Sequence, residues 1–206
     1  KHLKENFSAE KIYKKFAEAV YGQELVRNAE YIFVSDLFPH QYIGGAELSL
    51  GALAATAPKA HLTINSEEIN NSFINLYSNK TWVIGNYTNI NENILTMLTE
   101  GDINYNVVEF DYKYCQYRNL ELHKLMEGKD CDCEYGKHGK LVESFLKSAN
   151  KVFFMSNEQM NIHLDRLELE ETKCAVLSSV FTNETLDRIK NLRKKYADQK
   201  QNFWAI

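Results

Sequence analysis

Short apolar runs alternate along the chain with longer segments whose apolar residues recur every three or four positions. Short runs of this kind are typical of buried strands, and the longer spacing is typical of amphipathic helices. The predicted strands span residues 31–35, 60–64, 81–84, 104–110, 151–155 and 174–177. The predicted helices span residues 8–28, 46–56, 67–76, 91–99, 117–126, 140–149, 157–167 and 183–196.

Strand and helix alternate from one end of the chain to the other. This order predicts an α/β fold, in which helices flank both faces of a parallel sheet. In open parallel sheets, ligands bind beyond the carboxyl ends of the strands. We therefore expect three loops to share that edge, at residues 40–47, 111–115 and 156–159, and we expect Asn86 to join them.

The loop after the first strand is the most informative segment. It carries the paired glycines Gly44 and Gly45, and a helical pattern starts at once with Ala46 and Glu47. A helix start presents unpaired N–H groups, and glycine lets a ligand approach the backbone closely. The pattern predicts a site for a phosphate or another anion. The alternative is a tight turn without a ligand, in which Glu47 caps the helix and holds the loop.

Gly44-Gly45-Ala46-Glu47, placed after the first strand, resembles the N-terminal half of the family-four retaining glycosyltransferases, which have the GT-B architecture. The run from Lys151 to Ser156, followed by a helix, is similar to the last major strand of that domain and its serine. Residues 177–181 are similar to the segment that leads toward the hinge, and residues 203–206 to the first strand of the second domain.

The resemblance implies a Rossmann-like sheet that is the N-terminal half of a GT-B fold, facing a second Rossmann-like domain across a cleft. It divides the chain into a helical extension (1–29), an acceptor-side domain (30–182), and a linker helix with the first strand of a truncated C-terminal domain (183–206). The missing domain would hold most of a nucleotide-sugar, so we expect this portion to be inactive alone. The first residue is Lys rather than Met, which also suggests a piece of a longer protein.

The implied reaction moves a hexose from a nucleotide-sugar, the co-substrate, to a hydroxyl of a saccharide or lipid-linked acceptor, with retention of configuration. The resemblance implies no cofactor and no metal for this reaction. The expected donor-phosphate residues are Gly44, Gly45, Ala46 and Glu47; the expected catalytic residues are Asp111 and His40; and the expected acceptor-binding residues are Ser156, Asn86 and Tyr112.

Each of these residues also has a structural interpretation. Asp111 ends a strand, where Asp often stabilises a turn or caps a helix. His40 could be an exposed loop residue, and Ser156 an N-cap. Tyr112 belongs to a tyrosine cluster in which the rings could simply pack together.

A second group of residues has the chemistry of a zinc site. Cys115, Cys131, Cys133 and His138 fall in one region, and His123 lies nearby in the sequence. Thiolates and imidazole are zinc ligands, and a structural site needs four of them. The spacing favours zinc only weakly, because Cys-x-Cys is tighter than the usual Cys-x-x-Cys. The alternative is a set of unlinked thiols, and without a secretory signal we do not expect a disulfide framework.

Composition narrows the function classes. The 206 residues carry a formal net charge of -4, which argues against a nucleic-acid partner, since such proteins usually show a basic surface. No apolar run reaches the roughly 18 residues that a membrane-spanning helix needs. We therefore expect the protein in the cytoplasm, or peripherally on a membrane.

Two other functions compete with glycosyl transfer. A dinucleotide-binding oxidoreductase domain would share the fold, but the chain lacks the full Gly-x-Gly-x-x-Gly motif and a clear acidic residue after the second strand. A non-catalytic binding module stabilised by zinc would be centred on the cysteine-bearing loop. Metal content separates this last class from the other two.

Overall fold

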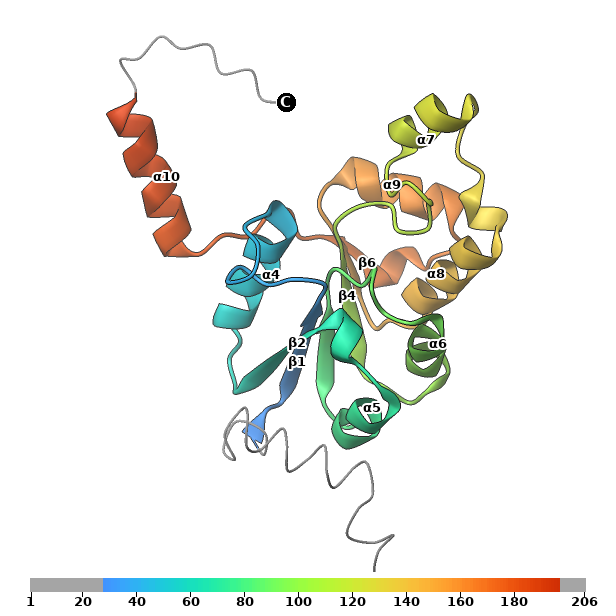
Figure 1. Ribbon diagram of the computed structural model, residues 1–206, viewed down its shortest axis with the longest axis horizontal. Helices are drawn as coiled ribbons and strands as arrows, with labels where there is room; N and C mark the ends of the chain where they lie inside the picture. Colours follow the sequence, from blue (N-terminus) through green and yellow to red (C-terminus); the bar gives the residue numbers. More distant parts are fainter. Residues whose placement is uncertain (1–27, 197–206) are drawn as a thin grey trace, which may run out of the picture.

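The computed structural model describes residues 28–196, which form a six-stranded sheet with all strands parallel (Figure 1). The order across the sheet is β2-β1-β3-β4-β5-β6. The strands are β1 (Tyr31–Ser35), β2 (His61–Asn65), β3 (Thr81–Ile84), β4 (Tyr105–Glu109), β5 (Val152–Phe154) and β6 (Cys174–Val176). The predicted α/β fold is confirmed. The predicted helix at 8–28 and the segment 203–206 lie outside the described residues, apart from residue 28.

Seven α-helices belong to the described part of the chain. They are α4 (Gly45–Ala55), α5 (Asn71–Tyr77), α6 (Glu92–Glu100), α7 (Leu120–Glu127), α8 (Lys137–Ser148), α9 (Asn157–Arg166) and α10 (Asn183–Lys195). Three short 3-10 turns, η1 (Ser66–Glu68), η2 (Cys133–Tyr135) and η3 (Glu171–Lys173), lie between them.

Side-chain caps explain where several helices begin. Asn70, Asn91, Asn119, Ser156 and Thr182 each accept a hydrogen bond from a backbone N–H of the following turn. The helix predicted at 67–76 therefore starts only at Asn71, after η1, and the helix predicted at 117–126 starts at Leu120, after its Asn119 cap.

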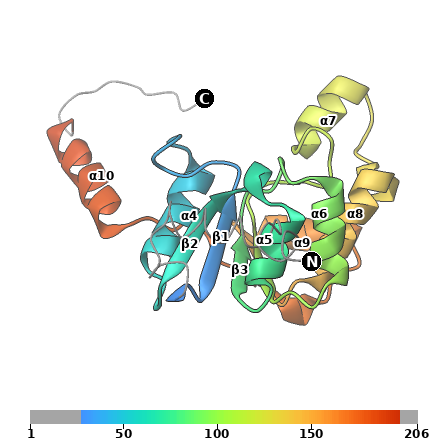
Figure 2. The same cartoon turned by 60° about the horizontal axis from the view of Figure 1, so that its bottom comes forward.

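The strand order reverses direction once, and this reversal arranges the helices. The chain steps from β1 to β2 through α4, and then crosses back over β1 to reach β3 through α5. Parallel crossovers are right-handed, so a change of direction moves the following helices to the opposite face of the sheet. As a result α4 covers one face, while α5, α6, α8 and α9 pack on the other (Figures 1 and 2).

The larger hydrophobic core lies between the sheet and α5, α6 and α8. Its aromatic residues are held by hydrogen bonds as well as by packing. Trp82 Nε1 donates to the Tyr77 carbonyl at 2.9 Å, and the Tyr105 hydroxyl donates to the Phe145 carbonyl at 2.6 Å. A smaller cluster, centred on Phe33, Leu50 and Val108, lies beneath α4.

The final helix, α10, extends away from the sheet and has no buried residue (Figure 1). Its apolar side chains Leu186, Ile189 and Leu192 are exposed. The interpretation of α10 as a linker helix stays a prediction.

His163 on α9 is a titratable group inside the core. Its side chain is fully buried, its Nδ1 lies 2.9 Å from the Gln159 carbonyl, and its ring stacks on that of Tyr112. Burial lowers the pKa of His163 to about 4, from an ordinary value of 6.5. The folded protein therefore keeps this imidazole neutral over a pH range in which the unfolded chain protonates it.

We expect the free energy of unfolding to fall as the pH is lowered from about 6.5 toward 4, because there the unfolded state binds a proton that the folded state excludes. Between pH 6.5 and 4.5 the loss due to His163 should be about 2–3 kcal/mol, at about 1.4 kcal/mol per pH unit. Urea unfolding at a series of pH values measures it. His163→Phe, which keeps an aromatic ring, should flatten this dependence, and an unchanged slope in the variant would contradict the assignment.

Candidate functional site

The loops that follow β1 and β3 diverge at the point where the strand order reverses, and Asp36 joins them. Its carboxylate accepts hydrogen bonds from the backbone N–H groups of Thr88 and Asn89, each at 3.1 Å. It also accepts from the hydroxyl of Ser66, which follows β2. One carboxylate thus holds three loops together at the carboxyl edge, where open sheets of this kind bind ligands. The predicted site did not include Asp36.

The loop that carries Gly44 and Gly45, which we call the glycine loop, also lies where the strand order reverses. We call this place the switch point. Gly44 is the N-cap of α4, with an extended backbone, and Gly45 is its first helical residue. A Cβ on Gly44 would collide with the carboxylate of Glu47, whereas a Cβ on Gly45 would meet no atom within 4 Å. The space beside Gly44 is therefore filled by Glu47, which is 7% exposed, and the approach to Gly45 is open.

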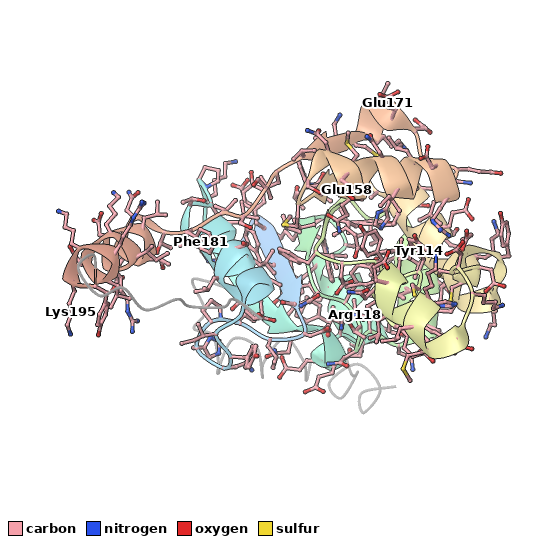
Figure 3. The ribbon with its side chains drawn as sticks, turned by 90° about the horizontal axis from the view of Figure 1, so that it is seen from above. Tyr114, Arg118, Glu158, Glu171, Phe181 and Lys195 are labelled. Atoms are coloured by element: carbon pink, nitrogen blue, oxygen red, sulfur yellow. The ribbon has the colours of Figure 1, made fainter. Side chains whose placement is uncertain are left out.

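A chain of polar side chains runs from Glu47 across the edge to β4, and we call it the edge network. Asn86 Nδ2 lies 3.4 Å from Glu47 Oε1, and Asn86 Oδ1 lies 3.5 Å from Arg118 Nη2. Arg118 donates from Nε to Asp111 Oδ2 at 2.8 Å. Seen from above, Arg118 lies between α4 and α7 (Figure 3).

The network continues into the protein interior through Lys113, which is 4% exposed. Its ammonium group lies 3.0 Å from Asp111 Oδ1 and 3.1 Å from Glu109 Oε1. The hydroxyl of Tyr87 donates to Glu109 Oε2 at 2.6 Å. Two carboxylates (Glu109 and Asp111) are thus balanced by two cations (Lys113 and Arg118), as buried charges require.

The surroundings shift the pKa values of the two acids in opposite directions. Burial raises the pKa of Glu109, and the attraction of Lys113 only partly opposes this effect. Burial would also raise the pKa of Asp111, but Lys113 and Arg118 together lower it below its ordinary value. Asp111 is therefore a good hydrogen-bond acceptor and a weak base, which suits binding of a hydroxyl better than removal of its proton.

A pocket of about 250 Å³ opens beside the network. Its lining residues are Tyr87, Thr88, Ile90, Glu92, Leu95, Lys113, Cys115, Gln116, Arg118 and His138. Arg118 reaches this pocket from a left-handed backbone conformation, with φ of 55°, which is strained for a residue with a side chain. Such strain often accompanies functional positions, and it could not have been seen in the sequence.

Three of the expected site residues lie apart from the network. His40 is exposed, stacks on Phe38 with ring centroids 6.3 Å apart, and lines a separate groove of about 400 Å³. The ring of Tyr112 stacks on His163 at 5.3 Å, and Ser156 Oγ accepts from Gln159 N at 3.1 Å as an N-cap. Within residues 28–196, none of these three side chains hydrogen-bonds to the network.

Gln159, three residues after Ser156, connects α9 to the network. Its Nε2 donates to the carbonyls of Glu109 and Asp111, at 3.2 and 3.0 Å, and so ties α9 to the segment that follows β4. Of the expected residues, the structure brings together Glu47, Asn86 and Asp111. The residues that link them, Lys113 and Arg118, were not predicted.

Three of the four cysteines gather next to the same pocket, which Cys115 helps to line. Potential ligand atoms of Cys115, His123, Cys131 and Cys133 all lie within 4.8 Å of one another. His138, the expected fourth ligand, instead places Nε2 2.9 Å from the Lys113 carbonyl, and His123 takes its place beside the thiols. Burial raises the pKa of the Cys131 thiol to about 12.

No protein-family model matches this chain, and neither does any curated protein or solved structure. Function is therefore inferred from the residues themselves. Among the residues that the structure describes, no helix is both long and apolar enough to cross a membrane.

The buried ion pair at the centre of the network has a measurable consequence. Lys113→Met should lower the free energy of unfolding by about 3–5 kcal/mol, because it leaves the buried carboxylate of Glu109 without its cation. The matched control is Lys59→Met, which breaks the exposed pair with Glu30 and should cost less than about 1 kcal/mol. Urea unfolding of both variants measures the difference.

The double variant Glu109→Gln/Lys113→Met removes both partners of the pair and should recover part of the loss. Equal losses for the Lys113 and Lys59 variants would contradict the charge balance described for the edge network.

Proposed function

We propose that this chain is the N-terminal, acceptor-side portion of a retaining glycosyltransferase that moves a sugar from a nucleotide-sugar to a hydroxyl acceptor. The observation that carries the proposal is the position of Gly45. It begins α4 at the point where the strand order reverses, and its Cα faces open space. A switch point with an accessible helix start is where an α/β sheet holds a phosphorylated ligand.

In the proposed site, the diphosphate of the donor meets the backbone amides on the Gly45 side of the loop. Glu47 already places a carboxylate beside Gly44, so that side repels an anion. The positive charge on the same edge comes from Arg118, which lines the neighbouring pocket. Amides and a cation directed at the leaving diphosphate would stabilise the charge that develops as the sugar bond breaks.

The acceptor hydroxyl is proposed to bind in the pocket beside the edge network. Arg118 lines this pocket and offers a donor, and its partner Asp111 is the ionised acceptor beside it. Because its pKa is lowered, Asp111 would orient the hydroxyl rather than act as a strong base. The donor-binding acidic residues are expected in the second domain that the family resemblance implies.

A dinucleotide-binding oxidoreductase domain remains the competing function, since it would use the same switch point. One binding experiment separates the two functions. Full-length protein containing this chain is incubated with a panel of nucleotide-sugars and, separately, with oxidised and reduced nicotinamide dinucleotides. Release of nucleoside diphosphate from a nucleotide-sugar supports transfer, and dinucleotide binding with no nucleotide-sugar turnover contradicts it.

Gly45→Val tests the close approach of the ligand to the backbone. The added side chain meets no protein atom at Cβ, so the melting temperature should stay nearly unchanged. The kcat/KM for transfer should fall by about 100-fold or more, as when one stabilising amide is lost.

The matched control for this test is Ala55→Val, which places the same valine side chain at an exposed position at the other end of α4. It should leave transfer unchanged. Normal transfer by Gly45→Val would refute a role for the glycine loop at the donor phosphates.

A further inference from the structure

We propose that Cys115, His123, Cys131 and Cys133 bind one zinc ion in a closed structural site that anchors α7 to the sheet domain. This cluster borders the proposed acceptor pocket, which Cys115 helps to line, but its argument does not depend on the transfer function. The four residues come from three places in the chain: the loop after β4, the first turns of α7, and the segment before α8.

The distances within the cluster match tetrahedral coordination. His123 Nδ1 lies 3.5 Å from Cys115 Sγ and 3.6 Å from Cys133 Sγ. With Zn–S bonds of about 2.3 Å and Zn–N bonds of about 2.05 Å, a tetrahedron has an N···S edge of about 3.6 Å. All four ligand atoms lie within 4.8 Å of one another, so one ion can reach them with small side-chain adjustments.

The backbone around the cluster is built to bring these residues together. Cys115 sits in a tight turn, in which its N–H donates to the Tyr112 carbonyl and its carbonyl accepts from Arg118 N–H. Gly128, with φ of 69°, ends α7 in the left-handed conformation that favours glycine and turns the chain back toward the thiols. Arg166 donates to the Cys131 carbonyl at 2.7 Å and holds that end of the loop.

The packing of α7 is the independent observation that points to a metal. His123 is the only buried residue of this helix, and it is 2% exposed. Leu122, Leu125 and Met126 are exposed instead, and α7 stands off the body of the domain (Figure 1). An eight-residue helix is not stable by itself, so it needs an anchor, and here the anchor is an imidazole surrounded by thiols.

Without a metal, this arrangement is costly. His123 is buried, and its Nδ1 meets only sulfur atoms, which are weak hydrogen-bond partners. Cys115 and Cys131 are at most 6% exposed. Ligation would replace these weak contacts with metal bonds, whose free energy adds directly to folding.

The donor set points to a structural site rather than a catalytic one. Four protein ligands complete a tetrahedron and leave no open position for water or substrate. Three thiolates and one Zn²⁺ carry a net charge of about −1. The guanidinium of Arg166 lies close by, where it donates to the Cys131 carbonyl and pairs with Glu134 at 2.8 Å. Cys115 also lies between Lys113 and Arg118 in the chain, so the ion would hold the segment that carries the edge network.

The direct test is the metal content of the full 206-residue chain, purified under reducing conditions, supplied with zinc and dialysed. We expect about one zinc per chain. Replacement by Co²⁺ should give the intense visible absorption of tetrahedral cobalt–thiolate coordination. This measurement uses the unaltered protein, so it does not depend on whether a variant folds.

Variants identify the ligands. Cys131→Ser and His123→Gln should each weaken zinc binding by more than about 100-fold, since even changes behind the ligands cost 10–100-fold. The matched controls are Cys174→Ser, a free thiol on β6, and His138→Gln, and both should keep the metal.

Three results would overturn the proposal. The reduced chain could hold no zinc above the level of Cys131→Ser, the cobalt form could show no thiolate absorption, or His138→Gln rather than His123→Gln could lose the ion. None of these results bears on nucleotide-sugar turnover, so failure of the zinc site and failure of the proposed transferase function are distinguishable.

Discussion

The handedness of crossovers in a parallel sheet is the constraint on which the rest of this structure depends. Because every connection must pass over one face in the right-handed sense, the single reversal after β2 places α4 on the side opposite to α5, α6, α8 and α9. The same reversal separates the loops that follow β1 and β3, and the glycine loop lies where they diverge. Asp36 then ties the two loops together, because its carboxylate accepts hydrogen bonds from backbone amides of the second loop.

Charge balance at the carboxyl edge follows from this geometry. The reversal leaves the ends of β3 and β4 beside the glycine loop, and the polar residues there must find partners as they are buried. Glu109 is fully buried and pairs with Lys113. Asp111 is partly exposed and pairs with both Lys113 and Arg118. The strained backbone of Arg118 is consistent with a side chain that is held in place by this network.

The thiol–imidazole cluster of Cys115, His123, Cys131 and Cys133 shares a chain segment with the edge network. Residues 111–118 contribute three members of the edge network and, through Cys115, one proposed metal ligand. His123 is the buried residue of α7, so this part of the chain is organised by polar contacts as well as by apolar burial. A zinc ion there would make the pocket beside Arg118 more rigid without taking part in its chemistry.

The sequence by itself determined the alternation of strands and helices, and with it the parallel sheet and the edge at which the glycine loop lies. These features are local: apolar runs, caps and glycines act over a few residues, so their pattern can be interpreted along the chain. The sequence also indicated Glu47, Asn86 and Asp111 at that edge, since polar residues at strand ends must collect there.

The tertiary structure alone decided which partners these residues find. Lys113 and Arg118 could not be predicted, because a charged side chain in a loop shows its burial and its ion pairs only after distant strands are placed side by side. For the same reason His123 rather than His138 lies with the cysteines, although both are close to them in the sequence. His123 points inward because of the direction that α7 takes after its Asn119 cap. His138 lies on α8, and its Nε2 lies against the backbone carbonyl of Lys113.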